Sequence, residues 1–409
     1  MRRPTHGATL TRGQAVLSPA SVVRGGGPRL TSRPLALLVV VAAALTDSAL
    51  PAPHLAAQAT THRDAERLST TAFARTVERL SERGGYFDTD NLISNESSYL
   101  HVVGKLGELG VRGGAYIGVG PDQNFSYIAH IRPRIALIID IRRDNLLQQL
   151  LFKALFSLAP NRTEYLALLL GRPVPRRSVG PDLQSLLAYL DSAPVRRDVF
   201  DHAHERVRAR MLTFGIPLSA QDLATIRRFH LAFHEAGLDL RFETHGRAPR
   251  WYYPTYRQLL LERDLHGRLA SYLAREESYQ FVRRLQERNL IVPVVGDLAG
   301  RRALKQIAAF LEQRGDPVSA FYTSNVEFYL MGDGTFDEFM DNVRRLPRNR
   351  RSVIIRSYFP SGGGPHPQAV QGYYSTQLLQ RFDDLIDIVE RRRIRSYFDL
   401  VTTASIALR

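Results

Sequence analysis

The segment from Ala115 to Asn145 constrains the fold of this chain more than any other. It contains two short apolar runs, AYIGVG and RIALIID, separated by the amphipathic stretch QNFSYIAHI. Short apolar runs predict strands that are buried on both faces, and a helical pattern between them predicts a crossover connection. Two strands joined in this way lie parallel in one sheet, so the segment predicts the start of an α/β fold.

The alternation of apolar runs and helical patterns returns after residue 285. The runs LIVPVVGD, PVSAFYTS and SVIIRSYF predict further strands, a last one is expected near 397–404, and TQLLQRFDDLIDIVE at 376–390 predicts a helix. Between 146 and 285 the apolar residues recur only with helical spacing. The chain therefore predicts a doubly wound, mostly parallel sheet that is interrupted by a large helical insertion or cap.

The first 59 residues have the layout of a secretory signal. A basic flank precedes an apolar core from Leu35 to Leu45, and Ala57-Gln58-Ala59 forms a small-residue cleavage pattern. The core is too short to cross a hydrocarbon layer of ~30 Å as a helix. We expect residues 1–59 to be a signal peptide or disordered leader of an exported, periplasmic protein whose mature form has no stable transmembrane helix. A cytoplasmic or membrane-tethered protein is the alternative.

Composition excludes several classes of chemistry. Cysteine is absent, which excludes disulfides, thiolate metal sites and cysteine nucleophiles. The net charge of +15 comes almost entirely from arginine, because the only lysines are Lys105, Lys153 and Lys305. The arginines are scattered among acidic residues and form no stripe interleaved with aromatic residues, so we expect no specific binding of nucleic acid.

The glycines that end the first apolar run could bring backbone close to a ligand. Gly118 and Gly120 present no Cβ, and the following helix would offer free N–H groups. Asp140 ends the second run, 20 residues after Gly120, where an acid can accept hydrogen bonds from ribose hydroxyls. In the alternative interpretation the glycines serve packing alone, and Asp140 pairs with Arg142, Arg143 or a neighbouring loop.

Two familiar phosphate-binding motifs are incomplete here. The dinucleotide fingerprint needs a third glycine at position 123, which is Gln123 in this chain, although Arg142 and Arg143 could suit a 2′-phosphate. A Gly-Lys-Ser/Thr sequence of the Walker type does not follow the glycines.

The blocks YIGVGPDQ, IIDIR, VVGD and SAFYTSNVEFYL, in this order, resemble the class I S-adenosylmethionine-dependent methyltransferases. The resemblance covers residues 96–145 and 290–402, and it implies a Rossmann-like domain in two parts, 60–145 and 286–409, around an insertion at 146–285. It also implies S-adenosylmethionine as the cofactor. The positions that it assigns to cofactor binding are Gly118 and Gly120 on the methionine and ribose side, Asp122 where a third glycine is common, Asp140 at the ribose, Asp297 at the adenine, and Thr323, Ser324 and Asn325 beside the reactive methyl group.

The chain departs from that family at two places. Tyr116 stands where an acid usually precedes the first glycine, and Thr323-Ser324-Asn325-Val326 replaces the Asn/Asp-Pro-Pro-aromatic signature of amino-group methylation. Taken together, the blocks NLISNESSYLHV, GVGPDQNF, DIRRDN, PVVGDLAG and FYTSNVEFYL also resemble a bacterial family without an assigned function.

Other chemistries find less support. His230 and His234 share a helix face, but Leu231 interrupts the HExxH pattern, so we expect structural histidines and no metal site. Gly-x-Ser-x-Gly is absent, and the sequence places no Ser/His/Asp arrangement. The aromatic run at 251–256 is interpreted as a packed loop, with a substrate pocket as the alternative.

These observations support two hypotheses. The first is an S-adenosylmethionine-dependent methyltransferase of unknown acceptor, or a descendant of one that still binds a small nucleoside-type ligand. The second is an exported, non-catalytic binding or structural protein on the same Rossmann-like fold. The sequence carries no signal for a methyl acceptor, a general base or an oligomeric state.

Overall fold

A computed structural model describes residues 67–177, 179–247, 250–360 and 364–409 of the chain. The expected signal peptide at 1–59 lies outside the described residues, so its cleavage and the compartment of the protein stay predictions. Within the described ranges, no helix combines the length and the apolar character that crossing a bilayer requires.

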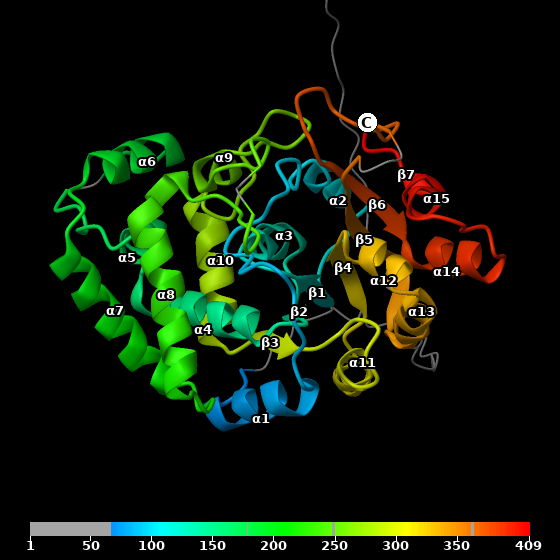
Figure 1. The fold of residues 1–409 in the computed structure, drawn as a ribbon, viewed down its shortest axis with the longest axis horizontal. Coiled ribbons are helices and arrows are strands. Elements are labelled where there is room, and N and C mark those ends of the chain that lie inside the picture. Colours follow the sequence, from blue (N-terminus) through cyan, green and yellow to red (C-terminus); the bar gives the residue numbers. More distant parts are fainter. Residues whose placement is uncertain (1–66, 178, 248–249, 361–363) are drawn as a thin grey trace, which may run out of the picture. The chain divides into compact units, whose positions relative to one another are not determined.

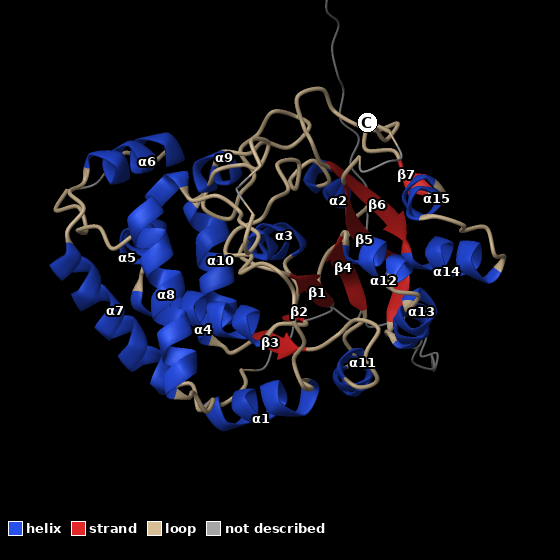
Figure 2. Ribbon diagram, viewed as in Figure 1, coloured by secondary structure: helices blue, strands red, loops and turns tan. Residues whose placement is uncertain are grey.

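The core of the fold is a seven-stranded sheet in the order β3-β2-β1-β4-β5-β6-β7 (Figures 1 and 2). Strands β1 to β5 run parallel, β6 is antiparallel to β5, and β7 is antiparallel to β6. The prediction of an α/β fold with a doubly wound, mostly parallel sheet is confirmed. The strands are β1 Ala115–Val119, β2 Ile135–Asp140, β3 Ile291–Val295, β4 Val318–Ser324, β5 Arg348–Tyr358, β6 Thr376–Arg381 and β7 Ser405–Ile406.

Helices cover both faces of the sheet. Helices α3, α4 and α10 pack together on one face, while α1, α11 and α13 contact one another on the other face (Figure 1). The elements are α1 Thr70–Leu80, α2 Val103–Glu108, α3 Gln123–Ile131, α4 Arg143–Leu158, α5 Arg162–Leu169, α6 Leu183–Ser192, α7 Arg197–Leu212, α8 Ala220–Ala236, the 3-10 helix η1 Gly237–Asp239, α9 Tyr256–Leu260, α10 Glu276–Glu287, α11 Ala303–Arg314, α12 Val326–Gly332, α13 Phe336–Arg345, α14 Phe382–Glu390 and α15 Tyr397–Thr402.

The helical insertion lies between β2 and β3. Its described residues contain no strand, only isolated bridges such as Arg241 to Thr255. Its first and last helices, α4 and α10, belong to the layer that covers the sheet, because α4 contacts β2 and β3 and α10 packs on α3 and α4. Helices α5, α7 and α8 contact α4, and α6 lies farther from the sheet (Figure 2).

Two local predictions were wrong. Residues 376–381 form the strand β6 rather than the start of a helix, because they pair with β5 and the helix α14 begins only at Phe382. The expected strand near 397–404 is the helix α15, whose first turn is capped by the Ser396 side chain.

Candidate functional site

The predicted cofactor-binding residues all follow or end one of four parallel strands. Gly118 and Gly120 lie at the end of β1, Asp140 ends β2, and Asp297 follows β3. Ser324 ends β4 with Thr323 before it and Asn325 after it, and Asp122 precedes α3. The strand order reverses between β1 and β4, which is where open α/β sheets bind their ligands. We call this side of the sheet the carboxyl edge.

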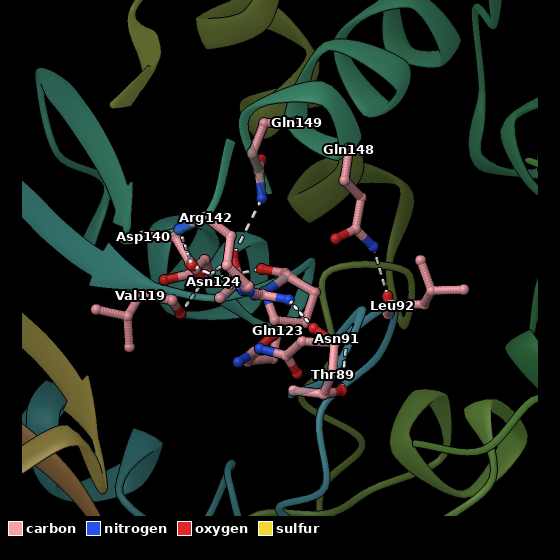
Figure 3. Close-up of polar contacts among 12 residues, drawn as sticks. Thr89, Asn91, Leu92, Val119, Gln123, Asn124, Asp140, Arg142, Gln148 and Gln149 are labelled. Carbon is pink, nitrogen blue, oxygen red and sulfur yellow. Dashed lines mark hydrogen bonds and ion pairs between the residues drawn. The ribbon is translucent and has the colours of Figure 1, made fainter. Parts of the chain in front are cut away.

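A loop crosses the carboxyl edge (Figure 3). We call residues 86–98 the strap. The Arg142 guanidinium donates to the Thr89 carbonyl at 2.6 Å, and the Gln148 amide donates to the Leu92 carbonyl at 2.6 Å. Side chains from the start of α4 therefore hold the strap over the ends of β1 and β2.

The Asn124 side chain occupies the space beside Gly118. A Cβ at Gly118 would collide with the Asn124 amide oxygen, so only glycine fits at this position. The same amide oxygen accepts a hydrogen bond from Tyr116 Oη at 2.8 Å, and its nitrogen donates to Val119 O at 2.9 Å and to Pro121 O at 2.8 Å. These bonds fix the turn after β1, in which Gly120 has a φ of +82°.

Asp140 is held by Arg142. The Arg142 backbone N–H and Nε both donate to Oδ1 at 2.9 Å, and Nη2 donates to Oδ2 at 2.8 Å. A carboxylate has about four acceptor positions, so Arg142 leaves roughly one of them for another donor. This pairing is the contact that the alternative interpretation of the sequence describes.

Four buried amide side chains lie at the start of α3 and on α4, near the turn after β1 or the strap. Gln149 Nε2 donates to Gly120 O at 3.2 Å, and Gln123 Nε2 donates to Tyr322 Oη at 3.2 Å. Gln148 reaches the strap at Leu92 (Figure 3). Asn145 lies on the same face of α4 as Gln148 and Gln149. We call these residues the amide cluster: Gln123, Asn145, Gln148 and Gln149.

The amide cluster keeps unused hydrogen-bonding capacity. All four side chains are buried. Among the described residues, neither the oxygen nor the nitrogen of the Asn145 amide has a hydrogen-bond partner, and the Oε1 atoms of the three glutamines have none either. A buried amide that makes no hydrogen bond costs about 1–3 kcal/mol, so this concentration of spare donors and acceptors calls for a polar partner.

A buried carboxyl connects the strap to β4. Glu96 Oε2 accepts a hydrogen bond from Tyr322 Oη at 2.6 Å, and Oε1 accepts one from Ser324 Oγ. Burial raises the pKa of Glu96, and hydrogen bonds from Ser324, Ser357 and Tyr322 offset part of that rise.

Asp122 faces the helical insertion. Its Oδ2 accepts hydrogen bonds from Tyr256 Oη at 2.9 Å and from Tyr272 Oη at 3.2 Å. Burial raises the pKa of Asp122 to about 6, although both tyrosine hydroxyls favour the charged form. Asp122 therefore anchors the start of α3 to the insertion.

Asp297 and Thr323 have structural partners. The Asp297 carboxylate accepts the Ala299 N–H at 2.9 Å, as in an Asx turn. Thr323 donates to Glu327 at 2.9 Å, and Glu327 forms a fully buried ion pair with Arg356. The structure thus brings Gly118, Gly120 and Asp140 next to the amide cluster and joins Ser324 to Glu96.

A cavity of about 730 Å³ lies at the ends of β2 and β3. Its lining includes Gly84, Arg143, Leu146 and Val295, together with residues of α1. This volume is within the ~300–1,000 Å³ typical of small-molecule sites.

His204, His230 and His234 form hydrogen bonds within the helical insertion. His230 Nε2 donates to Leu168 O at 3.0 Å, so its Nδ1 can accept from His204 Nδ1 at 3.1 Å. Across the described ranges, no three histidine, cysteine, aspartate or glutamate side chains gather as metal ligands would.

Sequence reasoning missed the residues that complete this site. Asn124, Gln148, Gln149 and Glu96 were not singled out as functional. One local signal exists: polar amides at positions 145, 148 and 149 recur with helical spacing inside an otherwise apolar helix. The partners of Glu96 lie too far along the chain to leave such a signal.

The fold and this edge define a doubly wound α/β domain with a buried polar site at its switch point. The chain belongs to the family described as Domain of unknown function (DUF7790), which matches residues 92–210 and 239–405. The family description names no activity, and comparison with curated proteins finds no match.

Proposed function

We propose that this domain binds a small nucleoside-type molecule at the carboxyl edge, and that S-adenosylmethionine is the first ligand to test. Methyl transfer to an acceptor of unknown class is the activity that such binding would serve. The observation that carries the proposal is the amide cluster, whose buried donors and acceptors are unused at the point where sheets of this kind bind ligands.

Amide side chains suit a nucleobase. Asparagine and glutamine each present a donor beside an acceptor, a pairing that matches the polar edge of adenine. Asn145 has both atoms free for such a pair, and Gln149 is fixed on Gly120 so that its oxygen stays available. Asp140 contributes about one acceptor position, which suits a single ribose hydroxyl rather than two.

The second candidate is a binding or structural protein without catalysis. It is favoured by the two side chains that stand where the methyltransferase resemblance places the cofactor. Asn124 fills the space beside Gly118, and Arg142 takes most of the capacity of Asp140. A nucleoside could still bind at the amide cluster in such a protein, but a methionine chain would have to displace Asn124.

Isothermal titration of the purified chain with S-adenosylmethionine, S-adenosylhomocysteine and adenosine tests the proposal. Asn145→Leu removes the amide at similar volume and breaks no internal hydrogen bond. We expect it to weaken binding about ten- to a hundredfold, which corresponds to ~1–3 kcal/mol for two hydrogen bonds. The melting temperature of the unliganded variant should hold or rise, because an unsatisfied buried amide is gone.

Gln286→Leu is the matched control. Gln286 is also a buried helical glutamine whose Oε1 has no partner among the described residues, but it lies on α10 beside Lys153. It should leave binding unchanged. Absence of binding heat with all three compounds would refute the nucleoside proposal, and equal affinity of Asn145→Leu and the parent chain would place the ligand elsewhere.

A further inference from the structure

Ser324 has an unusual backbone conformation at the carboxyl edge of the sheet. It is the last residue of β4, its φ is +55°, and α12 begins two residues later at Val326. A residue with a side chain adopts this left-handed region rarely, and such strain concentrates at active sites. The turn from strand to helix holds the half-buried Ser324 hydroxyl at the carboxyl edge, beside the switch point between β1 and β4.

The Ser324 hydroxyl is aimed at a carboxylate that other groups hold in place. Ser324 Oγ donates to Glu96 Oε1, and the second oxygen of Glu96 accepts from Tyr322 Oη at 2.6 Å. Tyr322 in turn accepts a hydrogen bond from Gln123. Glu96 is 1% exposed, so few competing waters can solvate its charge. A serine hydroxyl in contact with a positioned base is the arrangement that nucleophilic catalysis requires.

We propose that Ser324 is a nucleophile for acyl transfer and that Glu96 is its general base. The Ser324 oxygen attacks the carbonyl carbon of an ester while its proton passes to Glu96 Oε1. The bond between the carbonyl carbon and the alcohol oxygen then breaks, and the proton on Glu96 passes to the departing alkoxide. In the second half of the reaction, a water molecule attacks the carbonyl carbon of the acyl-serine and gives a proton to Glu96. The bond to the Ser324 oxygen then breaks, the proton passes from Glu96 to that oxygen, and the carboxylic acid leaves.

The neighbouring surface indicates the substrate class. Phe328 and Tyr329, on α12 just after Ser324, are each 42% exposed, and Tyr329 packs edge-on against Phe87 of the strap. Exposed aromatic rings beside the nucleophile suit an ester with an apolar acyl group. This inference does not rest on the nucleoside proposal, because the nucleophile Ser324 and the base Glu96 both lie outside the amide cluster.

Ser185 and Ser219 also contact carboxylates and serve as internal comparisons. Ser185 donates to Asp182 at 2.6 Å and Ser219 donates to Asp222 at 2.9 Å. Both pairs belong to the caps of helices, and Ser219 has an ordinary φ of −75°. Hydrogen bonding to a carboxylate alone therefore does not distinguish Ser324; the strained turn and the buried base do.

A fluorophosphonate reagent tests the nucleophile, since it phosphonylates activated serines with loss of fluoride. We expect the full chain to gain one adduct, which peptide mass spectrometry locates at Ser324, and to hydrolyse p-nitrophenyl butyrate. Ser324→Ala should abolish both. Glu96→Gln should slow labelling about a hundredfold or more, the usual size of general-base effects. Labelling should increase with pH through a range above that of an ordinary carboxyl, because burial raises the pKa of Glu96.

The controls separate chemistry from folding. Ser185→Ala should label like the parent chain, and circular dichroism checks the fold of each variant. If Glu96→Gln does not fold, Tyr322→Phe keeps the ring, removes the second hydrogen bond to Glu96, and should still slow labelling. Failure to label Ser324 in the folded parent chain, or equal labelling of Ser324 and Ser185, would overturn the inference. Labelling of Ser324 without any nucleoside binding would support it and refute only the proposed ligand.

Discussion

Arg142 and Arg143 are adjacent arginines that each form a bidentate ion pair with an aspartate. The structure predicts very different losses of stability when each arginine is replaced. Arg142 binds Asp140 with the two side chains 7% and 11% exposed. Arg143 binds Asp222 at 2.8 and 3.0 Å, but its own side chain is 48% exposed. We expect Arg142→Gln to destabilise the fold strongly and Arg143→Gln only weakly.

The magnitude follows from burial. Removing one member of a buried ion pair leaves an uncompensated charge and costs about 3–5 kcal/mol. For Arg142→Gln that charge is Asp140, and the strap also loses the hydrogen bond to the Thr89 carbonyl. In Arg143→Gln the charge left behind is Asp222, whose side chain is 12% exposed, but its carboxylate keeps the Ser219 backbone and hydroxyl donors. An exposed pair of this kind contributes ~0–1 kcal/mol.

Urea unfolding of the two variants measures the difference, because the midpoint shifts with stability while the slope reports the surface exposed. Hydrogen exchange adds a local readout: amides of the strap should exchange faster in Arg142→Gln than in Arg143→Gln, since of these two arginines it is Arg142 that donates a hydrogen bond to the strap. Equal losses in the two variants, or unchanged exchange in the strap of Arg142→Gln, would refute the assignment of Arg142 as the strap's anchor.

Two further perturbations test buried charge elsewhere in the fold. Burial lowers the pKa of His230 from 6.5 to about 3, and the nearby His204, His234 and Arg227 reinforce the shift. Below pH 6.5 the unfolded chain therefore binds more protons than the folded chain. The free energy of unfolding should fall by up to ~1.4 kcal/mol per pH unit as the pH drops toward 3. In urea unfolding between pH 6.5 and 5, His230→Gln should flatten this pH dependence, whereas substitution of the exposed His202 by glutamine should not. An unchanged pH dependence in His230→Gln would contradict the assignment of the effect to His230. The Arg356–Glu327 pair is 2% and 0% exposed at 2.8 Å, so Glu327→Gln should cost about 3–5 kcal/mol in the same assay, and Arg356→Met combined with Glu327→Leu should recover most of it. A single variant as stable as the parent chain would show that water reaches the pair.

The parts of the fold that could be predicted are those whose signal is local. The segment from β1 to β2 contains two apolar strands, a helix with a 3.6-residue pattern and a turn that needs glycine, so order and orientation follow from a short stretch of chain. The end of the chain failed because its patterns are ambiguous. The six residues TQLLQR fit the pattern of a strand or of a helix, and their pairing with β5 makes them a strand.

The site divides in the same way. Asp140 and Arg142 are two residues apart, so the alternative that they pair could be stated from sequence. Ser324 and Glu96 are 228 residues apart and meet only because the strap crosses the sheet. Local pattern gave the positions at the carboxyl edge, while the groups that occupy those positions depend on tertiary packing.

The face of α4 that carries Asn145, Gln148 and Gln149 shows why the strap matters. In an isolated helix this polar face would meet water, but here the strap and the turn after β1 cover it and supply only one hydrogen bond each, to Gln148 and Gln149. Covering polar groups without satisfying them is unfavourable, so other contacts must stabilise the strap, such as those of Arg142 with Thr89 and of Glu96 with Tyr322. A buried face that keeps spare hydrogen-bonding capacity after its own chain has folded over it needs water or a ligand as its partner. The variant Asn145→Leu distinguishes the two partners. If water occupies the site, the leucine displaces it and leaves the affinity for nucleosides unchanged. If a nucleoside binds there, the leucine removes a contact and weakens the affinity at least tenfold, by ~1.4 kcal/mol.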